Sequence, residues 1–272
     1  MRIAPTLGAL LFAAAALPGA ALAAGGAGEV TDVDFSFEGP FGTYDRFQLQ
    51  RGFQVYHQIC AGCHGLKHVS FRSLGNEDGP AFPDEQIDAI AAQYQVPDTG
   101  PDAMPGDTRP AVASDKFPEN NLVGAPDMSL IAKARAGFHG PMGTGLNQLF
   151  KGIGGPEYIY SLLLGYTGET VEQAGTVLYE NEVMAGGLIN MAPPLYGDDV
   201  EYAAYGDPNG YVPPEPTLEQ QAKDVSAFLM WAAEPTLVQR KEAGFRNLIW
   251  LIILAVLLYF TNKKIWAPVK GE

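Results

Sequence analysis

The chain contains little cysteine and little positive charge. It has 2 cysteines and 4 histidines in 272 residues, and 17 Lys and Arg against 31 Asp and Glu. A structural zinc site takes four ligands, usually two cysteine pairs or a cysteine pair with a histidine pair, so two cysteines do not complete one. The formal net charge of -14 excludes nucleic acid as a partner, because the phosphate backbone repels an acidic surface.

The two cysteines stand together in Cys60-Ala61-Gly62-Cys63-His64. C-x-x-C-H is the attachment motif of a c-type haem, in which the thiols form thioethers with the haem vinyl groups and the histidine is the proximal iron ligand. A thioredoxin-type C-x-x-C is disfavoured, because a helical stretch precedes the motif and a Gly/Ser loop follows it. A disulfide closing so short a loop would contribute little stability. The motif therefore predicts one haem c, held covalently through Cys60 and Cys63, with His64 on the iron.

The N-terminus has the pattern of a secretory signal. Arg2 precedes an apolar run over residues 7–17, and Ala21-Leu22-Ala23 supplies a small-residue cleavage site. An N-terminal membrane anchor is disfavoured, because the run is short and ends in small residues. We expect residues 1–23 to be a signal peptide, and export would place the thiols outside the cytoplasm, where c-type haem is attached.

A second apolar run lies near the C-terminus, over residues 248–260, with no charge and no glycine. A helix of that length covers about 20 Å, short of the roughly 30 Å hydrocarbon core, so we predict a transmembrane helix over 243–262. A buried amphipathic helix would carry a polar stripe, which this run lacks. Basic residues flank both ends, so orientation follows from export: the domain over 24–242 is outside, and the tail over 263–272 is cytoplasmic.

The soluble domain is rich in turn-forming residues, since the chain has 32 Gly and 21 Pro and few runs alternate as strands do. Four helices are predicted, at 44–59, at 127–136 with Asp127 as N-cap, at 156–164, and at 217–233 with a Thr217/Gln220 capping box. A helix before C-x-x-C-H and an amphipathic helix at the end of the domain are the framework of the class I cytochrome c fold. We therefore expect a mainly α, class I cytochrome c-like haem domain with long ordered loops, plus one C-terminal transmembrane helix.

The sixth iron ligand is sought among the remaining methionines and histidines of the exported chain. These candidates are Met104, Met128, Met142, Met184, Met191, Met230, His57, His68 and His139. Met191 is favoured because it opens the segment MAPPL, whose two prolines stiffen the backbone into an extended loop, and Met184 is the next candidate. A thioether ligand raises the reduction potential, and a filled sixth position leaves no vacancy for oxygen or peroxide.

Several longer segments carry a specific resemblance. They are FSFEGPFGTYDRFQLQRGFQVYHQICAGCHGL, APDMSLIAKARAG, GGPEYIYSLLLGY, MAPPL and KDVSAFLMWAAEP, followed by the apolar C-terminal run. From about Phe35 to its C-terminus the chain resembles bacterial members of the cytochrome c1 family, the haem subunits of ubiquinol–cytochrome c oxidoreductase. The resemblance implies that Met191 is the axial ligand and that Arg135 pairs with a haem propionate. It also implies that Asn121 and Tyr158 line the haem pocket.

Two departures from the family pattern are visible. Some bacterial relatives carry a second cysteine pair between the helix of Tyr158 and the axial methionine, and this chain has none there. The stretch over 167–188 must therefore be held by other means. Residues 138–153 resemble a bacterial insertion to which no role is assigned.

The resemblance implies a function and partners. One electron would pass from the Rieske iron–sulfur protein, which receives it from quinol oxidised at cytochrome b, through the haem to a soluble or tethered cytochrome c. The chain would lie in the bacterial inner membrane with its haem domain in the periplasm, and would itself make no substrate bond. Two alternatives stay open: an independent membrane-anchored cytochrome c shuttle, and a haem enzyme or gas sensor with an open sixth position.

An acidic stretch bears on the electron acceptor. Between Lys151 and Lys223 the sequence has no Lys or Arg, and eleven acids fall there: Glu157, Glu169, Glu172, Glu180, Glu182, Asp198, Asp199, Glu201, Asp207, Glu215 and Glu219. Acids beside an electron-exit site attract basic redox partners and speed their encounter. For any single acid, ordinary solubility of an exported domain is the better explanation. The uninterrupted run favours a basic cytochrome c as acceptor.

Overall fold

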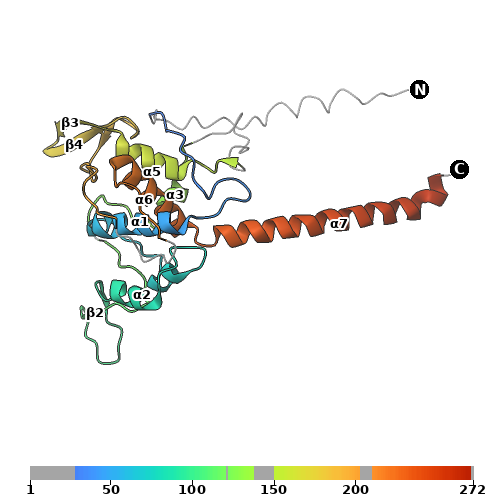
Figure 1. Ribbon diagram of the computed structural model, residues 1–272, viewed down its shortest axis with the longest axis horizontal. Helices are drawn as coiled ribbons and strands as arrows, with labels where there is room; N and C mark the ends of the chain where they lie inside the picture. The colour runs from blue at the N-terminus through green and yellow to red at the C-terminus, as the bar shows by residue number, and fades with distance from the viewer. Residues whose placement is uncertain (1–27, 121, 138–149, 203–209, 271–272) are drawn as a thin grey trace, which may run out of the picture.

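The computed structural model describes residues 28–120, 122–137, 150–202 and 210–270, and the predicted signal peptide lies outside them. A group of helices forms the body of the domain, and the last helix projects away from it (Figure 1). The helices are α1 (Arg46–Gln58), α2 (Asp84–Ala91), α3 (Ile131–Ala134), α5 (Gly155–Leu164), α6 (Leu218–Ala233) and α7 (Leu237–Lys270), with the 3-10 helices η1 (Cys60–Gly62) and η2 (Phe71–Gly75). The strands are β1 (Gln95–Pro97), β2 (Thr108–Pro110), β3 (Tyr166–Gln173), β4 (Thr176–Asn181) and β5 (Leu188–Ile189). The mainly α, cytochrome c-like fold class with a C-terminal membrane-length helix is confirmed.

The first and last helices of the domain cross at close range. Gly52 makes this possible, because a Cβ at that position would lie 2.0 Å from the backbone oxygen of Asp224 and 2.7 Å from the Cβ of Phe228. The backbone of α1 therefore rests directly on α6. This contact brings the C-terminal end of α1, which leads into the C-x-x-C-H motif, into a set position on the domain.

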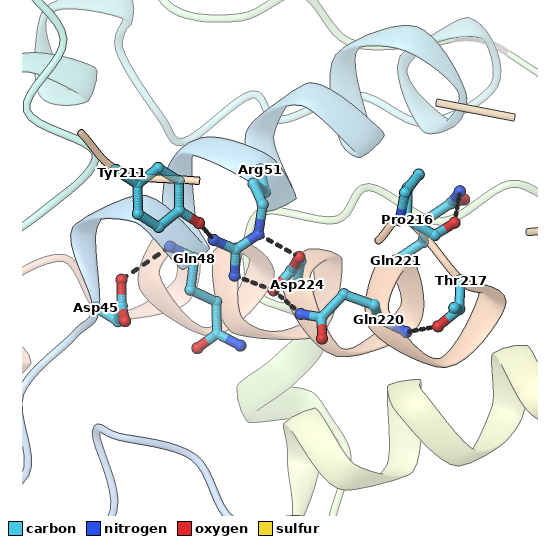
Figure 2. Close-up of polar contacts among 9 residues, drawn as sticks. All are labelled: Asp45, Gln48, Arg51, Tyr211, Pro216, Thr217, Gln220, Gln221 and Asp224. Carbon is cyan, nitrogen blue, oxygen red and sulfur yellow. Dashed lines mark hydrogen bonds and ion pairs between the residues drawn. The ribbon is translucent and has the colours of Figure 1, made fainter. Parts of the chain in front are cut away.

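A buried ion pair links the same two helices (Figure 2). The guanidinium of Arg51 on α1 donates to both carboxylate oxygens of Asp224 on α6, at 2.7 and 2.9 Å, and also to the hydroxyl of Tyr211. The Asp224 side chain is 0% exposed, so water does not solvate its negative charge. The guanidinium of Arg51 compensates this charge instead. The side-chain amide of Gln220 donates a further hydrogen bond to Asp224 at 2.9 Å. Removing either charged partner would leave the other buried and unpaired.

The helix boundaries agree with the capping patterns, with one correction. Asp45 accepts from the backbone N–H of Gln48 at the start of α1, and Thr217 accepts from that of Gln220 at the start of α6. The reciprocal half of the predicted capping box is absent, because the backbone N–H of Thr217 donates to the carbonyl of Glu215 at 2.9 Å and not to the side chain of Gln220. The helix still begins where expected.

An aromatic cluster fills the space beneath α1 and α6. Phe53 makes edge contacts with Phe82, Phe117 and Phe228, with ring centroids 5.5, 6.4 and 5.5 Å apart. All four rings are buried. Edge-to-face packing of this kind adds to the burial of apolar area and fixes ring orientation. The core therefore joins the haem-motif helix to the segment between η2 and α2, which carries Phe82, and to the segment after β2, which carries Phe117.

The predicted helix over 127–136 is wrong in extent, since only Ile131–Ala134 is helical. Asp127 is not the N-cap of a helix: its carboxylate accepts from the backbone N–H groups of Ser129 and Lys67, both at 3.0 Å. The contact to Lys67 crosses 60 positions of sequence. Because the Asp127 carboxylate accepts these hydrogen bonds, the residues around it form a turn and not the first turn of a helix.

The segment after α5 forms an antiparallel sheet that strand periodicity did not predict. β3 and β4 pair as a hairpin, and β5 pairs with β4. Asn181, which is 0% exposed, anchors the hairpin: its side-chain amide donates to the carbonyl of Leu162 at 2.8 Å and accepts from the N–H groups of Val183 and Met184. This network holds the stretch over 167–188, where some relatives carry a cysteine pair.

The last helix begins inside the domain and ends outside it. Leu237 and Val238 in its first turn are 4% and 7% exposed, whereas Phe245 and the apolar residues after it are exposed. Among the described residues one helix, Leu237–Pro268, is long and apolar enough to cross a membrane, and its apolar 18-residue stretch is 0% buried. The helix extends beyond the predicted span over 243–262 at both ends. Figure 1 shows it leaving the helical body as a straight rod.

Candidate functional site

The C-x-x-C-H motif directly follows the C-terminus of α1. The motif is folded into the 3-10 turn η1. The carbonyl of Cys60 accepts from the backbone N–H groups of Cys63 and His64, at 3.1 and 2.9 Å. Both thiols are free. Burial, with a smaller contribution from neighbouring Cys63, raises the pKa of the Cys60 thiol to about 12. The Cys60 thiol is therefore protonated at neutral pH.

The imidazole of His64 is oriented by a single backbone contact. Its Nδ1 lies 2.7 Å from the carbonyl oxygen of Pro126, and the residue is 7% exposed. A carbonyl can only accept, so Nδ1 carries the proton and Nε2 keeps its lone pair. A neutral imidazole whose far nitrogen is free and whose near nitrogen is held is the form that binds a metal. The tertiary structure thus leaves Nε2 of His64 without a hydrogen-bond partner among the described residues.

The loop that carries the motif is held on both sides. The hydroxyl of Tyr56 donates to the carbonyl of His64 at 2.9 Å, and the side-chain amide of Asn120 donates to that of Gly62 at 2.9 Å. A Cβ on Gly65 would lie 2.7 Å from the carbonyl of Pro118, so this glycine allows the two backbones to approach. These contacts limit movement of the turn that contains both thiols.

The other histidines do not offer a comparable iron ligand. Both ring nitrogens of His57 have partners, Nδ1 with the hydroxyl of Tyr94 at 2.7 Å and Nε2 with the side chain of Gln93 at 3.1 Å. Burial lowers the pKa of His57. His68 is exposed, and His139 lies outside the described residues.

The methionines separate by environment. Met104 is 70% exposed, Met128 and Met230 pack against the core, and Met142 lies outside the described residues. Met184 has its sulfur 3.9 Å from the hydroxyl of Tyr158.

Met191 is partly buried and follows β5 in the segment MAPPL. Its carbonyl accepts from the hydroxyl of Tyr166 at 3.0 Å, so the backbone is tied to the start of β3 while the thioether makes no hydrogen bond to the described residues. The hydrogen bond holds the main chain and leaves the side chain available, which is the arrangement that an axial ligand requires.

The remaining predicted site residues lie on two packed elements. Arg135 follows α3, and its backbone oxygen would be 3.0 Å from a Cβ on Gly155 at the start of α5. Its side chain is exposed and forms no ion pair with the described residues. Tyr158 is half-buried one turn along α5 and contacts Met184. Asn121 lies outside the described residues.

The described residues do not fit a metal site of another kind. No group of three or more His, Cys, Asp or Glu side chains among them could hold a metal ion. A C-x-x-C-H turn beside a held, neutral imidazole fits a haem instead, because the porphyrin supplies four of the iron ligands itself. Pro126 and Tyr166 were not predicted from the sequence. Their contacts to His64 and Met191 cross 62 and 25 positions, and no local pattern marks them.

A mainly α domain that presents C-x-x-C-H and continues into one membrane-length helix defines a class, the anchored haem proteins of electron transport. Residues 35–269 match the model of the cytochrome C1 family. The chain is 50% identical to cytochrome c1 of Cereibacter sphaeroides over 93% of this chain and 92% of that protein. It is 38% identical to cytochrome b/c1 of Bradyrhizobium diazoefficiens over 86% of this chain and 35% of that longer protein. It is 35% identical to the mitochondrial cytochrome b-c1 complex catalytic subunit of Candida albicans, over 86% of this chain and 76% of that protein.

The chain therefore belongs to the cytochrome c1 family. It is a haem subunit that transfers electrons in a respiratory chain, and the resemblance found in the sequence is confirmed.

Proposed function

We propose that this chain carries single electrons from a Rieske iron–sulfur protein to a cytochrome c. It would do so as the haem subunit of a quinol–cytochrome c oxidoreductase, by way of one haem c bound covalently through Cys60 and Cys63. When bound, the haem supplies a one-electron ferric/ferrous couple. The protein positions the group and sets its potential, and makes no substrate bond of its own.

The single observation that carries the proposal is the state of His64. Its Nδ1 proton is committed to the carbonyl of Pro126, so Nε2 is the free donor, beside two thiols on the same turn. Met191 is the proposed opposite ligand, because its backbone is tied by Tyr166 while its thioether is unengaged among the described residues. Filling both axial positions favours electron transfer over oxygen or peroxide chemistry.

Two further residues are proposed to contact the haem. The guanidinium of Arg135 is exposed and free of carboxylate partners among the described residues, which suits a propionate. Tyr158 is half-buried and directed at Met184, on the same side of the domain as the hairpin, and would line the pocket with Asn121. None of these side chains is required to move a proton.

We also propose the topology and partners. Residues 1–23 would be removed on export, residues 24–242 would form the periplasmic haem domain, 243–262 would cross the bacterial inner membrane, and 263–272 would be cytoplasmic. The exposed apolar surface of α7 supports the anchor. Cytochrome b is the proposed membrane partner. Two relatives support this partner. The Bradyrhizobium diazoefficiens protein is named cytochrome b/c1, and the Candida albicans protein is named a subunit of the cytochrome b-c1 complex.

Replacement of the proposed axial ligand tests the function. Met191→Leu keeps the volume and removes the sulfur, so the haem should stay attached through Cys60 and Cys63 while its midpoint potential falls by more than about 100 mV. Redox titration of the full chain, with carbon monoxide added to the reduced form, measures both effects. The reduced haem of the unmodified protein should not bind carbon monoxide, whereas that of the variant should bind it.

Met184→Leu is the matched control and should leave the potential and the carbon monoxide response unchanged. If Met184→Leu gives the drop and Met191→Leu does not, the ligand assignment is reversed. If the unmodified protein binds carbon monoxide, the sixth position is open and the electron-carrier assignment fails.

A further inference from the structure

A cavity lies where α7 leaves the domain, remote in the chain from the C-x-x-C-H turn. Its volume is about 400 Å³. Its walls come from the first turns of α7, the start of α5, the end of α6, Lys133 on α3, and the segments over 37–39 and 151–154. The electron-transfer function uses none of these side chains.

The cavity lies at the depth of lipid headgroups. Lys241 on α7 lines it, and Phe245, one turn further, is 50% exposed and stacks edge-on against Phe41, which is 72% exposed. Four residues of helix rise about 6 Å. The interfacial layer on each side of the hydrocarbon core is also about 5–8 Å thick. The two exposed rings therefore mark the edge of the hydrocarbon, and the cavity opens just above it.

One wall of the cavity carries excess positive charge. Lys133 and Arg240 share one carboxylate, that of Glu234, with the lysine 3.1 Å from it. Lys241 forms no ion pair with a described residue: its ammonium donates to the backbone carbonyls of Phe37 and Gly42, at 2.5 and 3.2 Å. Three cations facing one acid leave this wall able to accept a phosphate.

The opposite wall carries a buried acid pair. Glu157 is 1% exposed, and its Oε2 is buried without a hydrogen-bond partner. The carboxyl of Glu157 faces that of Glu38, which is half-buried and accepts from the backbone N–H of Phe35 at 3.0 Å. Two carboxyl groups in contact share one proton, so the pair carries one negative charge and has an acceptor oxygen to spare.

We propose that this cavity binds the headgroup of a phospholipid of the surrounding bilayer, and that the headgroup is ethanolamine. The phosphodiester would lie against Arg240, Lys241 and Lys133, and the primary ammonium would donate to Glu157 and Glu38. The inference rests on α7 crossing the membrane, as in the function proposed above.

The cavity needs both charges of the headgroup: a phosphate for its cationic wall and an ammonium for its acid pair. A glycerol headgroup offers no cation to the acid pair, and the quaternary ammonium of choline has no N–H with which to reach the unpartnered Oε2 of Glu157. A bound ammonium also replaces the proton that the acids share. Burial is the main cause that raises the pKa of Glu157 to about 8, so ethanolamine binding should strengthen as the pH rises from 6 to 9.

Lipid retention by the full-length holoprotein tests the proposal. The protein is reconstituted in vesicles of equal parts dioleoyl phosphatidylethanolamine, phosphatidylcholine and phosphatidylglycerol, extracted in mild detergent, washed, and its retained lipid quantified by mass spectrometry. We expect phosphatidylethanolamine to be retained about tenfold over either other lipid, the factor for one charge-assisted hydrogen bond. Glu157→Gln and Glu38→Gln should each remove this preference, and Arg240→Gln should lower retention of all three phospholipids.

Exposed residues away from the cavity supply matched controls. Glu172→Gln on β3 and Arg72→Gln in η2 should retain the preference. Circular dichroism and the haem spectrum of each variant establish that it is folded. Equal retention of the three lipids by the unmodified protein overturns the proposal, as does an unchanged preference in both glutamate variants.

The same samples separate this inference from the proposed function. If the protein has a high-potential haem that does not bind carbon monoxide but shows no lipid preference, only the proposal of the lipid site is overturned. Release of the unmodified chain from membranes by alkaline carbonate would remove the anchor, and with it both the lipid site and the membrane-bound function.

Discussion

At the scale of single residues, the charged groups inside the domain are compensated to different degrees. Asp224 receives both arms of the Arg51 guanidinium and the amide of Gln220, so it is fully paired. The carboxyl of Glu157 faces another acid, Glu38, and its Oε2 has no hydrogen-bond partner among the described residues. Burial therefore favours the protonated form of Glu157.

This difference predicts a pH dependence of stability. The pKa of Glu157 is raised to about 8 in the folded chain against an ordinary 4.5, so the folded state holds a proton that the unfolded state releases. The stabilisation is fully present below about pH 4.5 and is lost as the pH rises to about 8, in total on the order of 5 kcal/mol. Urea unfolding of the detergent-solubilised protein at pH 5 and pH 8 measures it. Glu157→Gln should flatten this part of the profile, and an equal slope in the variant would contradict the prediction.

At the scale of elements, the α1–α6 crossing is the contact that positions the haem motif. The two helices meet backbone to backbone at Gly52, and the Arg51–Asp224 pair lies beside that point. The crossing leaves no room for adjustment, because the atom nearest to Gly52 is a main-chain oxygen rather than the end of a flexible side chain.

Gly52→Ala should therefore destabilise the domain. Alanine is the better helix former by about 1 kcal/mol, but the overlap with Asp224 forces the helices apart at a cost of about 2–4 kcal/mol, so the net effect is a loss. Thermal unfolding followed by circular dichroism gives the change. Gly244→Ala in α7 is the control, since a Cβ there meets nothing within 4 Å, and its haem domain should unfold as in the parent. Equal melting of the two variants would show that the crossing tolerates a methyl group.

At the scale of the whole molecule, charge is distributed unevenly. Nine acids of the stretch between Lys151 and Lys223 are exposed: Glu169, Glu172, Glu180, Glu182, Asp198, Asp199, Glu201, Glu215 and Glu219. Glu157 is buried and is therefore not part of this exposed surface, and Asp207 lies outside the described residues. The β3–β4 hairpin and the segments on either side of MAPPL thus present acids to solvent. Their field would attract a basic partner from beyond contact distance.

The acidic surface predicts a salt-dependent reaction with a basic cytochrome c. Stopped-flow oxidation of the reduced protein should slow about tenfold or more between 10 and 200 mM salt, because screening shortens the range of the attraction. An acidic cytochrome c of similar potential should react slowly at low salt and gain speed as salt is added. A rate with the basic partner that does not depend on ionic strength would remove the acids from docking.

Local chemistry accounts for what could be predicted from the sequence. The Thr217 cap places the start of α6, α1 (Arg46–Gln58) lies within the predicted 44–59, and α5 begins at Gly155 where Pro156 predicts a first turn. Hydrogen bonds made by neighbouring residues decide these boundaries. The helix over 127–136 was overestimated, and the sheet of β3, β4 and β5 was missed, because Asp127 and Asn181 form contacts with distant chain segments that periodicity does not encode.

By itself the sequence determined the haem motif, the apolar C-terminal helix, the acidic charge and the family, because each depends on residue identity at short spacing. Only the tertiary structure decided that Nδ1 of His64 meets the carbonyl of Pro126, that Gly52 lies on Asp224, and that Glu157 is buried beside Glu38. Each of these contacts joins segments far apart in the chain. Their free energy comes from burial and exclusion of water, which exist only once the helices have packed.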